Sequence, residues 1–395
     1  MIVCGPFAPI ARRSHTPCCL TRAAALPREL LARVVSFLPS GDAVLTAPCL
    51  SKAWAAAAAP RVAEEWKVAA ALLDKTRFHM VFGHDCGYKP FSVPLWVLQE
   101  AWPRLTRQQR KLAAARAALH GDLAVLRWAL PQRDDAGTLY CAAAAAGGQL
   151  EALQCARTLG CKWDTSACTF AARGGQLAVL KWLRAQQPPC PWGEWICRAA
   201  AEDGHLAVLQ WARAQQPPCP WNAGTCSAAA QGGHLAVLQW ARAQQPPCPW
   251  DEGTCSAAAQ GGHLAVLQWA RAQDSPCPWD EGTCSKAAEG GHLAVLQWVR
   301  AQQPPCPWSE WTCSAAAAGG HLAVLQWMRA QQPPCPWDEW TCRDAACCGH
   351  LAVLQWVRAQ QPPCPWNATI CFGIARDDPI TEWIRAQAAL EGVAV

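Results

Sequence analysis

A unit of 29 residues returns along the chain with little change, and it constrains the fold more than any other feature. One copy reads HLAVLQWARAQQPPCPWDEGTCSAAAQGG, from His234 to Gly262. One apolar position marks the register, in steps of 27, 27 and then 29 residues: Leu123, Leu150, Leu177, Leu206, Leu235, Leu264, Leu293, Leu322, Leu351 and Ile380. The two short steps lack part of the proline-rich segment, which is typical of a loop. This period predicts an array of about ten stacked units.

Each copy predicts two short helices, an alanine-rich first helix such as Thr225 to Gln231 and an amphipathic second helix from Leu235 to Gln244. A glycine pair separates them, as a helix end requires. Apolar spacings of three and four residues give the second helix a broad apolar face, and the proline pair after Gln245 stops it. No segment alternates with a period of two. We therefore predict an all-α solenoid, in which Trp240 and Trp250 fill the gaps between layers.

The run TCSAAAQGGHLAVLQWARA resembles the helix, glycine turn and second helix of the ankyrin repeat, and the likeness covers residues 107–395. Two features depart from that family. Thr254-Cys255-Ser256 stands where ankyrins carry Thr-Pro-Leu-His, and the unit is about four residues shorter than the usual length of roughly 33. The resemblance implies stacked helix pairs, a β-hairpin finger that is shortened or absent, and a concave recognition surface on the side of the first helices.

A second module precedes the array, in residues 26–60, and it reads LPRELLARVVSFLPSGDAVLTAPCLSKAWAAAA. This order of residues resembles an F-box. The resemblance implies that five positions contact a Skp-type adaptor of a cullin ubiquitin ligase: Leu26, Pro27, Leu30, Val34 and Leu38. The alternative is a helical hairpin that caps the array, since terminal repeats need a polar outer face.

The rest of the N-terminal part carries weaker signals. Residues 1–25 contain arginines and no acidic residue, as transit peptides do, but their prolines favour a disordered tail. Residues 61–106 predict a partly helical connector. The net charge of +5 is mild and forms no continuous basic stripe, so we expect no nucleic-acid partner. No apolar stretch is long enough to cross a bilayer, so we expect no membrane partner.

The 25 cysteines admit three interpretations: core residues, metal ligands or disulfides. The repeat supplies two per unit, such as Cys219 and Cys226, followed by His234. This spacing does not match the close cysteine pairs of zinc sites. We favour core packing in a reducing compartment, the cytoplasm or nucleus, with no cofactor and no metal. A cysteine-rich metal or redox buffer remains the rival from another functional class.

Histidine also recurs once per unit, directly after glycine at the start of a second helix: His205, His234, His263, His292, His321 and His350. Six copies of one catalytic base are implausible, and we expect hydrogen bonds around the turn instead. The chain contains no nucleophile elbow, zinc-protease, Walker or dinucleotide motif. The sequence therefore predicts that the protein is not an enzyme.

Positions that differ between copies indicate where a partner binds, because positions needed for stacking stay the same. The variation lies in the first helices, where exposed tryptophan and arginine are the best candidates for binding energy. The predicted partner-binding residues are Trp195, Arg198, Trp311, Trp340, Arg343 and Asp344. The alternative is that these tryptophans only cover the loop below them. The favoured function is a noncatalytic protein-binding array that brings its target to a ubiquitin ligase, and the alternative is a plain scaffold with a helical cap.

Overall fold

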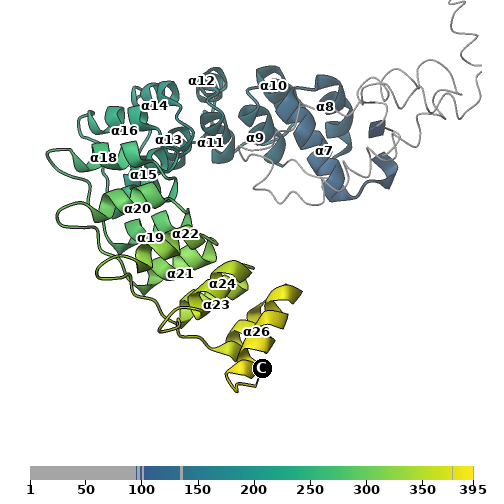
Figure 1. Ribbon diagram of the computed structural model, residues 1–395. Helices are drawn as coiled ribbons and strands as arrows, with labels where there is room; N and C mark the ends of the chain where they lie inside the picture. The colour runs from purple at the N-terminus through teal and green to yellow at the C-terminus, as the bar shows by residue number, and fades with distance from the viewer. Residues whose placement is uncertain (1–94, 96–97, 100–101, 134–136, 376, 395) are drawn as a thin grey trace, which may run out of the picture. The chain divides into compact units, whose positions relative to one another are not determined.

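The computed structural model describes residues 95, 98–99, 102–133, 137–375 and 377–394, and every regular element in these residues is a helix (Figure 1). The all-α prediction is confirmed. The F-box-like segment 26–60 and most of the connector 61–106 lie outside the described residues.

The chain divides into two compact units. Residues up to 117 together with 124–133 form the first, and 118–123 together with 134–395 form the second. The helices at the beginning of the described chain are η2 (Trp102–Arg104), α7 (Arg107–His120), α8 (Leu123–Ala129) and η3 (Leu130–Gln132). The Trp102 and Trp128 rings meet edge to face at 5.0 Å.

The second unit consists of consecutive helix pairs (Figure 1). The first helices are α9 (Leu139–Ala146), α11 (Thr165–Arg173), α13 (Glu194–Glu202), α15 (Ala223–Gln231), α17 (Glu252–Gln260), α19 (Glu281–Glu289), α21 (Glu310–Ala318), α23 (Glu339–Cys347) and α25 (Ala368–Ile374). The second helices are α10 (Leu150–Thr158), α12 (Leu177–Ala185), α14 (Leu206–Arg213), α16 (Leu235–Arg242), α18 (Leu264–Arg271), α20 (Leu293–Arg300), α22 (Leu322–Arg329), α24 (Leu351–Arg358) and α26 (Asp378–Leu390). The predicted solenoid of stacked helix pairs is confirmed.

The helix boundaries differ slightly from the prediction. Helix α15 begins two residues early, because Asn222 takes the extended N-cap position that precedes it. Helix α16 ends at Arg242 rather than Gln244. The turn between the two needs glycine, since Gly233 has a φ of +75°.

Small side chains allow each first helix to stack directly on the first helices of its neighbours. Ala229 and Ala230 of α15 are buried, and so are Val237, Leu238 and Ala241 of α16. Cys226 is fully buried in the same layer, as the core interpretation predicted. Neither helix of a pair can cover its own apolar face, so stability accumulates through contacts between neighbouring units.

The recurring histidines link neighbouring units. The Nε2 atom of His263, at the start of α18, lies 2.9 Å from the carbonyl oxygen of Gln231, at the end of α15 in the preceding unit. Four equivalent bonds join His205 to Arg173, His292 to Gln260, His321 to Glu289 and His350 to Ala318. We expected these bonds within a turn, but stacking brings the ring onto the neighbour's open helix end.

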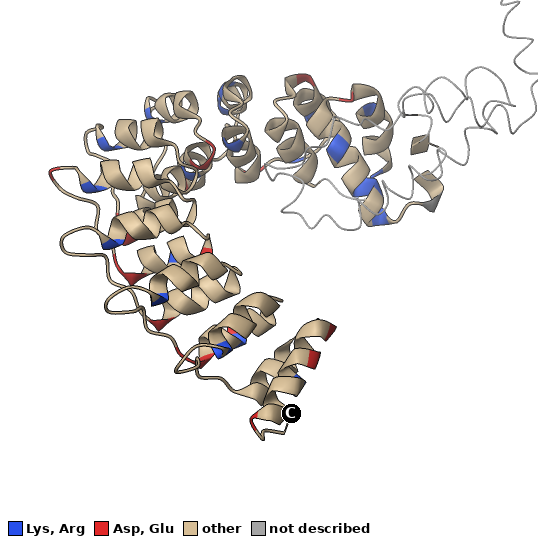
Figure 2. Ribbon diagram, viewed as in Figure 1, with Lys and Arg blue, Asp and Glu red and all other residues tan. Residues whose placement is uncertain are grey.

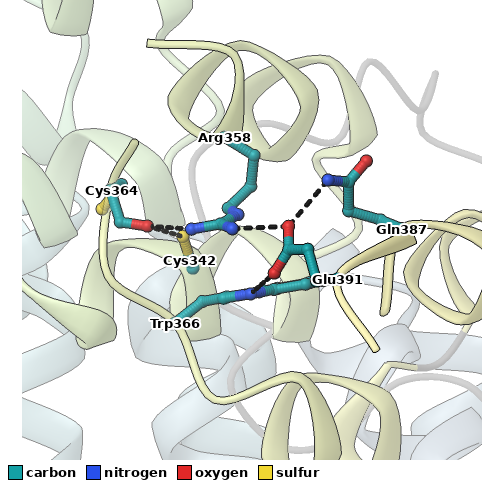
Figure 3. A network of polar contacts seen from close by, with 6 residues as sticks. All are labelled: Cys342, Arg358, Cys364, Trp366, Gln387 and Glu391. Carbon is teal, nitrogen blue, oxygen red and sulfur yellow. Dashed lines mark hydrogen bonds and ion pairs between the residues drawn. The ribbon is translucent and has the colours of Figure 1, made fainter. Parts of the chain in front are cut away.

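The last helix closes the array with a polar network (Figure 3). Glu391 accepts hydrogen bonds from Arg358 at 2.6 Å, Trp366 at 2.8 Å and Gln387 at 2.7 Å. Burial alone would raise the pKa of Glu391, but these three bonds outweigh it and hold the pKa below its ordinary value. The network therefore joins α24 and the connector that follows it to the C-terminal end of α26.

None of the helices in the described part of the chain combines the length and the apolar character that a bilayer span requires.

Candidate interaction surface

The tryptophans of the connectors are held by their own chain. Arg242 stacks over Trp250 at 4.1 Å and donates from Nη1 to the carbonyl of Cys248 at 2.7 Å. The other side of Trp250 meets Trp269 edge to face at 6.0 Å. Trp240 makes the same contact with Trp221 of the preceding connector at 5.9 Å. These half-buried rings form an arginine–tryptophan ladder along the array, and Trp250 contacts Arg242 of α16 and Trp269 of α18, so it bridges successive layers as we predicted.

The ladder repeats with little change, and it explains why one arginine and two tryptophans recur per unit. Figure 2 shows that these arginines account for much of the positive charge on the second helices. Stacking of guanidinium on indole recurs for Arg157 on Trp163, Arg184 on Trp192, Arg213 on Trp221, Arg271 on Trp279, Arg300 on Trp308, Arg329 on Trp337 and Arg358 on Trp366. Residues occupied in this way contribute to stability.

The buried cysteines also have internal partners. Cys226 Sγ of α15 lies 3.8 Å from the carbonyl of Cys248, and Cys248 Sγ donates to the carbonyl of Asn222 at 3.4 Å. A side-chain hydrogen bond with Cys248, together with burial, raises the pKa of Cys226 far above its ordinary value. A thiol held protonated in this way is a core residue and a poor nucleophile or metal ligand. Among the described residues, no group of three or more His, Cys, Asp or Glu side chains is placed to hold a metal ion.

The first helices present the variable surface, which we call the first-helix face. It consists of the second and fifth residues of six successive first helices. The second residues are Trp195, Gly224, Gly253, Gly282, Trp311 and Trp340, and the fifth residues are Arg198, Ser227, Ser256, Ser285, Ser314 and Arg343. Since these positions are three apart on a helix, the two side chains of each unit are neighbours.

The structure leaves the three predicted tryptophans exposed. The exposed fraction is 59% for Trp195, 53% for Trp311 and 36% for Trp340. Covering a loop does not account for rings with this much surface in solvent. Large apolar side chains with this exposure are the usual anchors of protein interfaces.

The predicted residues form two separate groups. At α13, the Arg198 guanidinium lies over the Trp195 ring at 5.3 Å. At α21 and α23, the Trp311 and Trp340 rings lie 5.9 Å apart with an interplanar angle of 36°, and Arg343 stacks over Trp340 at 4.1 Å. Three units with glycine at the tryptophan position separate the two groups.

The serines of the glycine-containing units join neighbouring first helices. The Ser227 hydroxyl lies 3.3 Å from that of Thr254, and Ser256 and Ser285 contact the next unit's threonine in the same way. Ser314 departs from this pattern, because it donates to the Asp344 carboxylate at 3.0 Å. Asp344 therefore helps to position α21 against α23, at the edge of the Trp311–Trp340 pair.

Carboxylates at the starts of the first helices belong to the same surface, and we did not predict them. Glu310 and Glu339 are exposed, and Asp338 accepts from the backbone nitrogen of Trp340 at 3.1 Å. Burial raises the pKa of Asp338, and the negative charges of Glu310 and Glu339 raise it further. A glutamate at this position recurs in most units, so a search for variable positions passes over it. The charge that surrounds this glutamate depends on the residue that the next unit places beside it, which is Asp338 in the case of Glu310.

The five residues expected to contact a Skp-type adaptor, Leu26, Pro27, Leu30, Val34 and Leu38, lie outside the described residues.

Among the comparisons with known proteins, only the comparison with solved structures found matches. No protein-family profile matches the chain, and no curated protein matches it. Two solved structures of the pentatricopeptide repeat protein PPR10 in complex with an 18-nt psaJ RNA element, one of them a triple cysteine-to-serine variant, match with 14% identity and a TM-score of 0.36. Each match covers 93% of this chain, which spans about half (53%) of the length of that protein. The helix pairs of its own structure make the chain a helical-repeat protein. Both matches are to a repeat family other than ankyrin.

The prediction that the protein has no nucleic-acid partner was wrong. Both matched structures are helical-repeat proteins bound to RNA. The mild net charge was the ground for that expectation, yet some helical repeats recognise one base with two or three side chains per repeat. The exclusion is therefore withdrawn.

Proposed function

We propose that this protein is a noncatalytic scaffold that binds a protein partner on its first-helix face. The observation that carries the proposal is the exposure of Trp195, Trp311 and Trp340, at a helix position where the three intervening units carry glycine. Burying an exposed indole removes a large apolar area from water, and such residues dominate the energetics of interfaces.

Differences between units support the same proposal. The arginine–tryptophan ladder is nearly identical from unit to unit, whereas the first-helix face changes from tryptophan to glycine and back. A surface needed only for stacking has no reason to vary in this way. The resemblance to ankyrin repeats favours the same side of the helices, because ankyrins use it for recognition.

The proposal can be tested by selecting peptides on the full chain from a displayed random library. Selected peptides should lose binding to a variant in which Trp195, Trp311 and Trp340 are replaced by alanine. The matched control is Leu390→Ala, which removes an 83% exposed apolar residue from α26 and should leave binding unchanged. Selected peptides that bind the triple variant as well as the parent would place the binding surface elsewhere.

The ligase link is a separate proposal, and it rests on the F-box-like sequence of residues 26–60. A Skp-type adaptor should bind the full chain and not the Leu30→Asp variant. Equal binding by the two proteins, or none by either, would leave the scaffold without a ligase.

A further inference from the structure

The three exposed tryptophans differ in whether the chain supplies a cation for the ring. Arg198 lies over Trp195 and Arg343 lies over Trp340, each three residues after its tryptophan. The residue three after Trp311 is Ser314, which donates to Asp344 instead. In the part of the chain that the structure describes, no arginine or lysine lies over Trp311. Trp311 therefore occupies the same helix position as the other two rings but lacks their cation.

Among the described residues, Glu310 and Asp338 beside Trp311 form no ion pair. At the other end of the face, Glu194 accepts a hydrogen bond at 2.8 Å from Asn222, the N-cap residue of the next unit. For Glu310, the equivalent N-cap residue of the next unit is Asp338, whose side chain is a carboxylate rather than an amide. Two carboxylates thus occupy the positions at which Glu194 and Asn222 form a hydrogen bond.

The charge of this region favours a cationic ligand. Glu310, Asp338, Glu339 and Asp344 contribute four acidic groups, and Arg343 contributes one basic group. An indole face attracts a cation through its quadrupole, and nearby carboxylates strengthen the attraction. Acidic residues continue at the starts of the preceding first helices, as Asp251, Glu252, Asp280 and Glu281.

We propose that Trp311, with the carboxylates of Glu310 and Asp338, binds a lysine or arginine side chain from a basic segment of the partner protein. This inference rests on the proposed scaffold function and names the chemistry of the partner. The partner's cation would occupy over Trp311 the position that Arg198 and Arg343 occupy over their own rings. Further basic residues of the same segment would meet the carboxylates of the glycine-containing units.

The test uses the full chain and a fluorescent peptide of alternating lysine and glycine, followed by anisotropy at low ionic strength. A peptide with glutamate in place of lysine is the charge control. Trp311→Ala should weaken binding by about three-fold to thirty-fold, the range expected for one cation–π contact. Added salt should weaken binding by the parent protein.

Ser314→Arg is the sharper variant, because it supplies the missing intramolecular cation. Ser314 itself is buried, with 2% of its surface exposed, so the new arginine must extend outward along α21 to reach the Trp311 ring, as Arg198 and Arg343 do from the same helix position. We expect Ser314→Arg to weaken binding at least as much as Trp311→Ala. Ser256→Arg adds the same charge beside Gly253, where there is no ring to cover, and should have a smaller effect. Circular dichroism would verify that each variant is folded.

Equal losses for Ser314→Arg and Ser256→Arg would show that only net charge matters, and an unchanged affinity for Trp311→Ala would overturn the inference directly. Peptides from the library selection separate this outcome from failure of the scaffold function. If selected peptides depend on the first-helix face but lack basic residues, the scaffold stands and the cationic partner falls. If no peptide depends on that face, both fall.

Discussion

Trp308 and Trp311 lie three residues apart and have opposite environments. Trp308, in a connector, is covered by Arg300 at 4.0 Å and meets Trp327 edge to face at 6.2 Å. Trp311, in the second position of α21, keeps 53% of its surface exposed. The difference shows that this array uses one residue type both for cohesion and as surface. The two uses differ in whether other side chains of the chain cover the ring. Amino-acid type and local composition are the same for both.

The largest expected effect comes from breaking the ladder. Trp250→Ala removes the stacking with Arg242 and the edge contact with Trp269, and should lower the free energy of unfolding by about 2 to 4 kcal/mol. Trp311→Ala, on the first-helix face, should lower it by less than about 1 kcal/mol. Urea unfolding monitored by circular dichroism measures both. Equal losses would remove the distinction between the two kinds of tryptophan.

A smaller effect is expected at the glycine turn between the first and the second helix of a unit. Gly233 has a φ of +75°, and a Cβ there would lie 2.5 Å from Nδ1 of His263. Gly233→Ala should therefore destabilise the protein by about 1 to 3 kcal/mol. Gly373→Ala is the matched control, because nothing lies within 4 Å of its Cβ position in α25. We expect that control to be neutral or to stabilise by up to about 1 kcal/mol in the same unfolding experiment.

The C-terminal network should respond to pH in a defined direction. Because the pKa of Glu391 is lower in the folded protein, its contribution is fully present above the ordinary value of about 4.5 and is lost as the pH falls through the lower folded value. Glu391→Gln should cost about 1 kcal/mol at neutral pH and little in strong acid. Hydrogen exchange of α26 at several pH values measures the difference. Glu382→Gln, an exposed position in the same helix, should show no such dependence.

The smallest effect is expected for Arg343, the half-buried arginine of the first-helix face. Arg343→Gln removes a cation from over Trp340 and should change the free energy of unfolding by less than about 0.5 kcal/mol, since exposed contacts of this kind are weak. Arg242→Gln removes both the stacking on Trp250 and the bond to the Cys248 carbonyl, so a larger loss is expected. Calorimetry of the pair would sharpen the comparison, and a reversed order would contradict it.

Much of the fold could be predicted because it is local and repeated. The alanine-rich helix, the glycine turn and the amphipathic helix each follow from a few neighbouring residues, as in residues 225–244. The burial of Cys226 also follows, because a small apolar residue in a stacked helix belongs in the core. The bond from His263 to Gln231 could not be predicted, since it joins residues 32 apart that only stacking brings together.

The candidate site was partly predictable for the same reason. Variation between copies located Trp195, Trp311 and Trp340, because comparison within one chain needs no structure. The carboxylates of Glu310 and Asp338 were missed, since the repulsion between them arises from two successive units. The absence of a cation over Trp311 was missed as well, although serine stands at position 314 where the other two tryptophan units carry arginine.

The periodic sequence alone was enough to specify helix pairs, their order and an elongated stack, because these depend on propensity and on apolar spacing within about 29 residues. Only the tertiary structure could separate a tryptophan that binds its own chain from one that faces solvent. Trp308 and Trp311 have similar local sequences and belong to the same unit. Arg300 of α20 and Trp327 of α22 lie beside the Trp308 ring, whereas Trp311 meets the exposed Trp340 ring of the next first helix and keeps 53% of its surface in solvent.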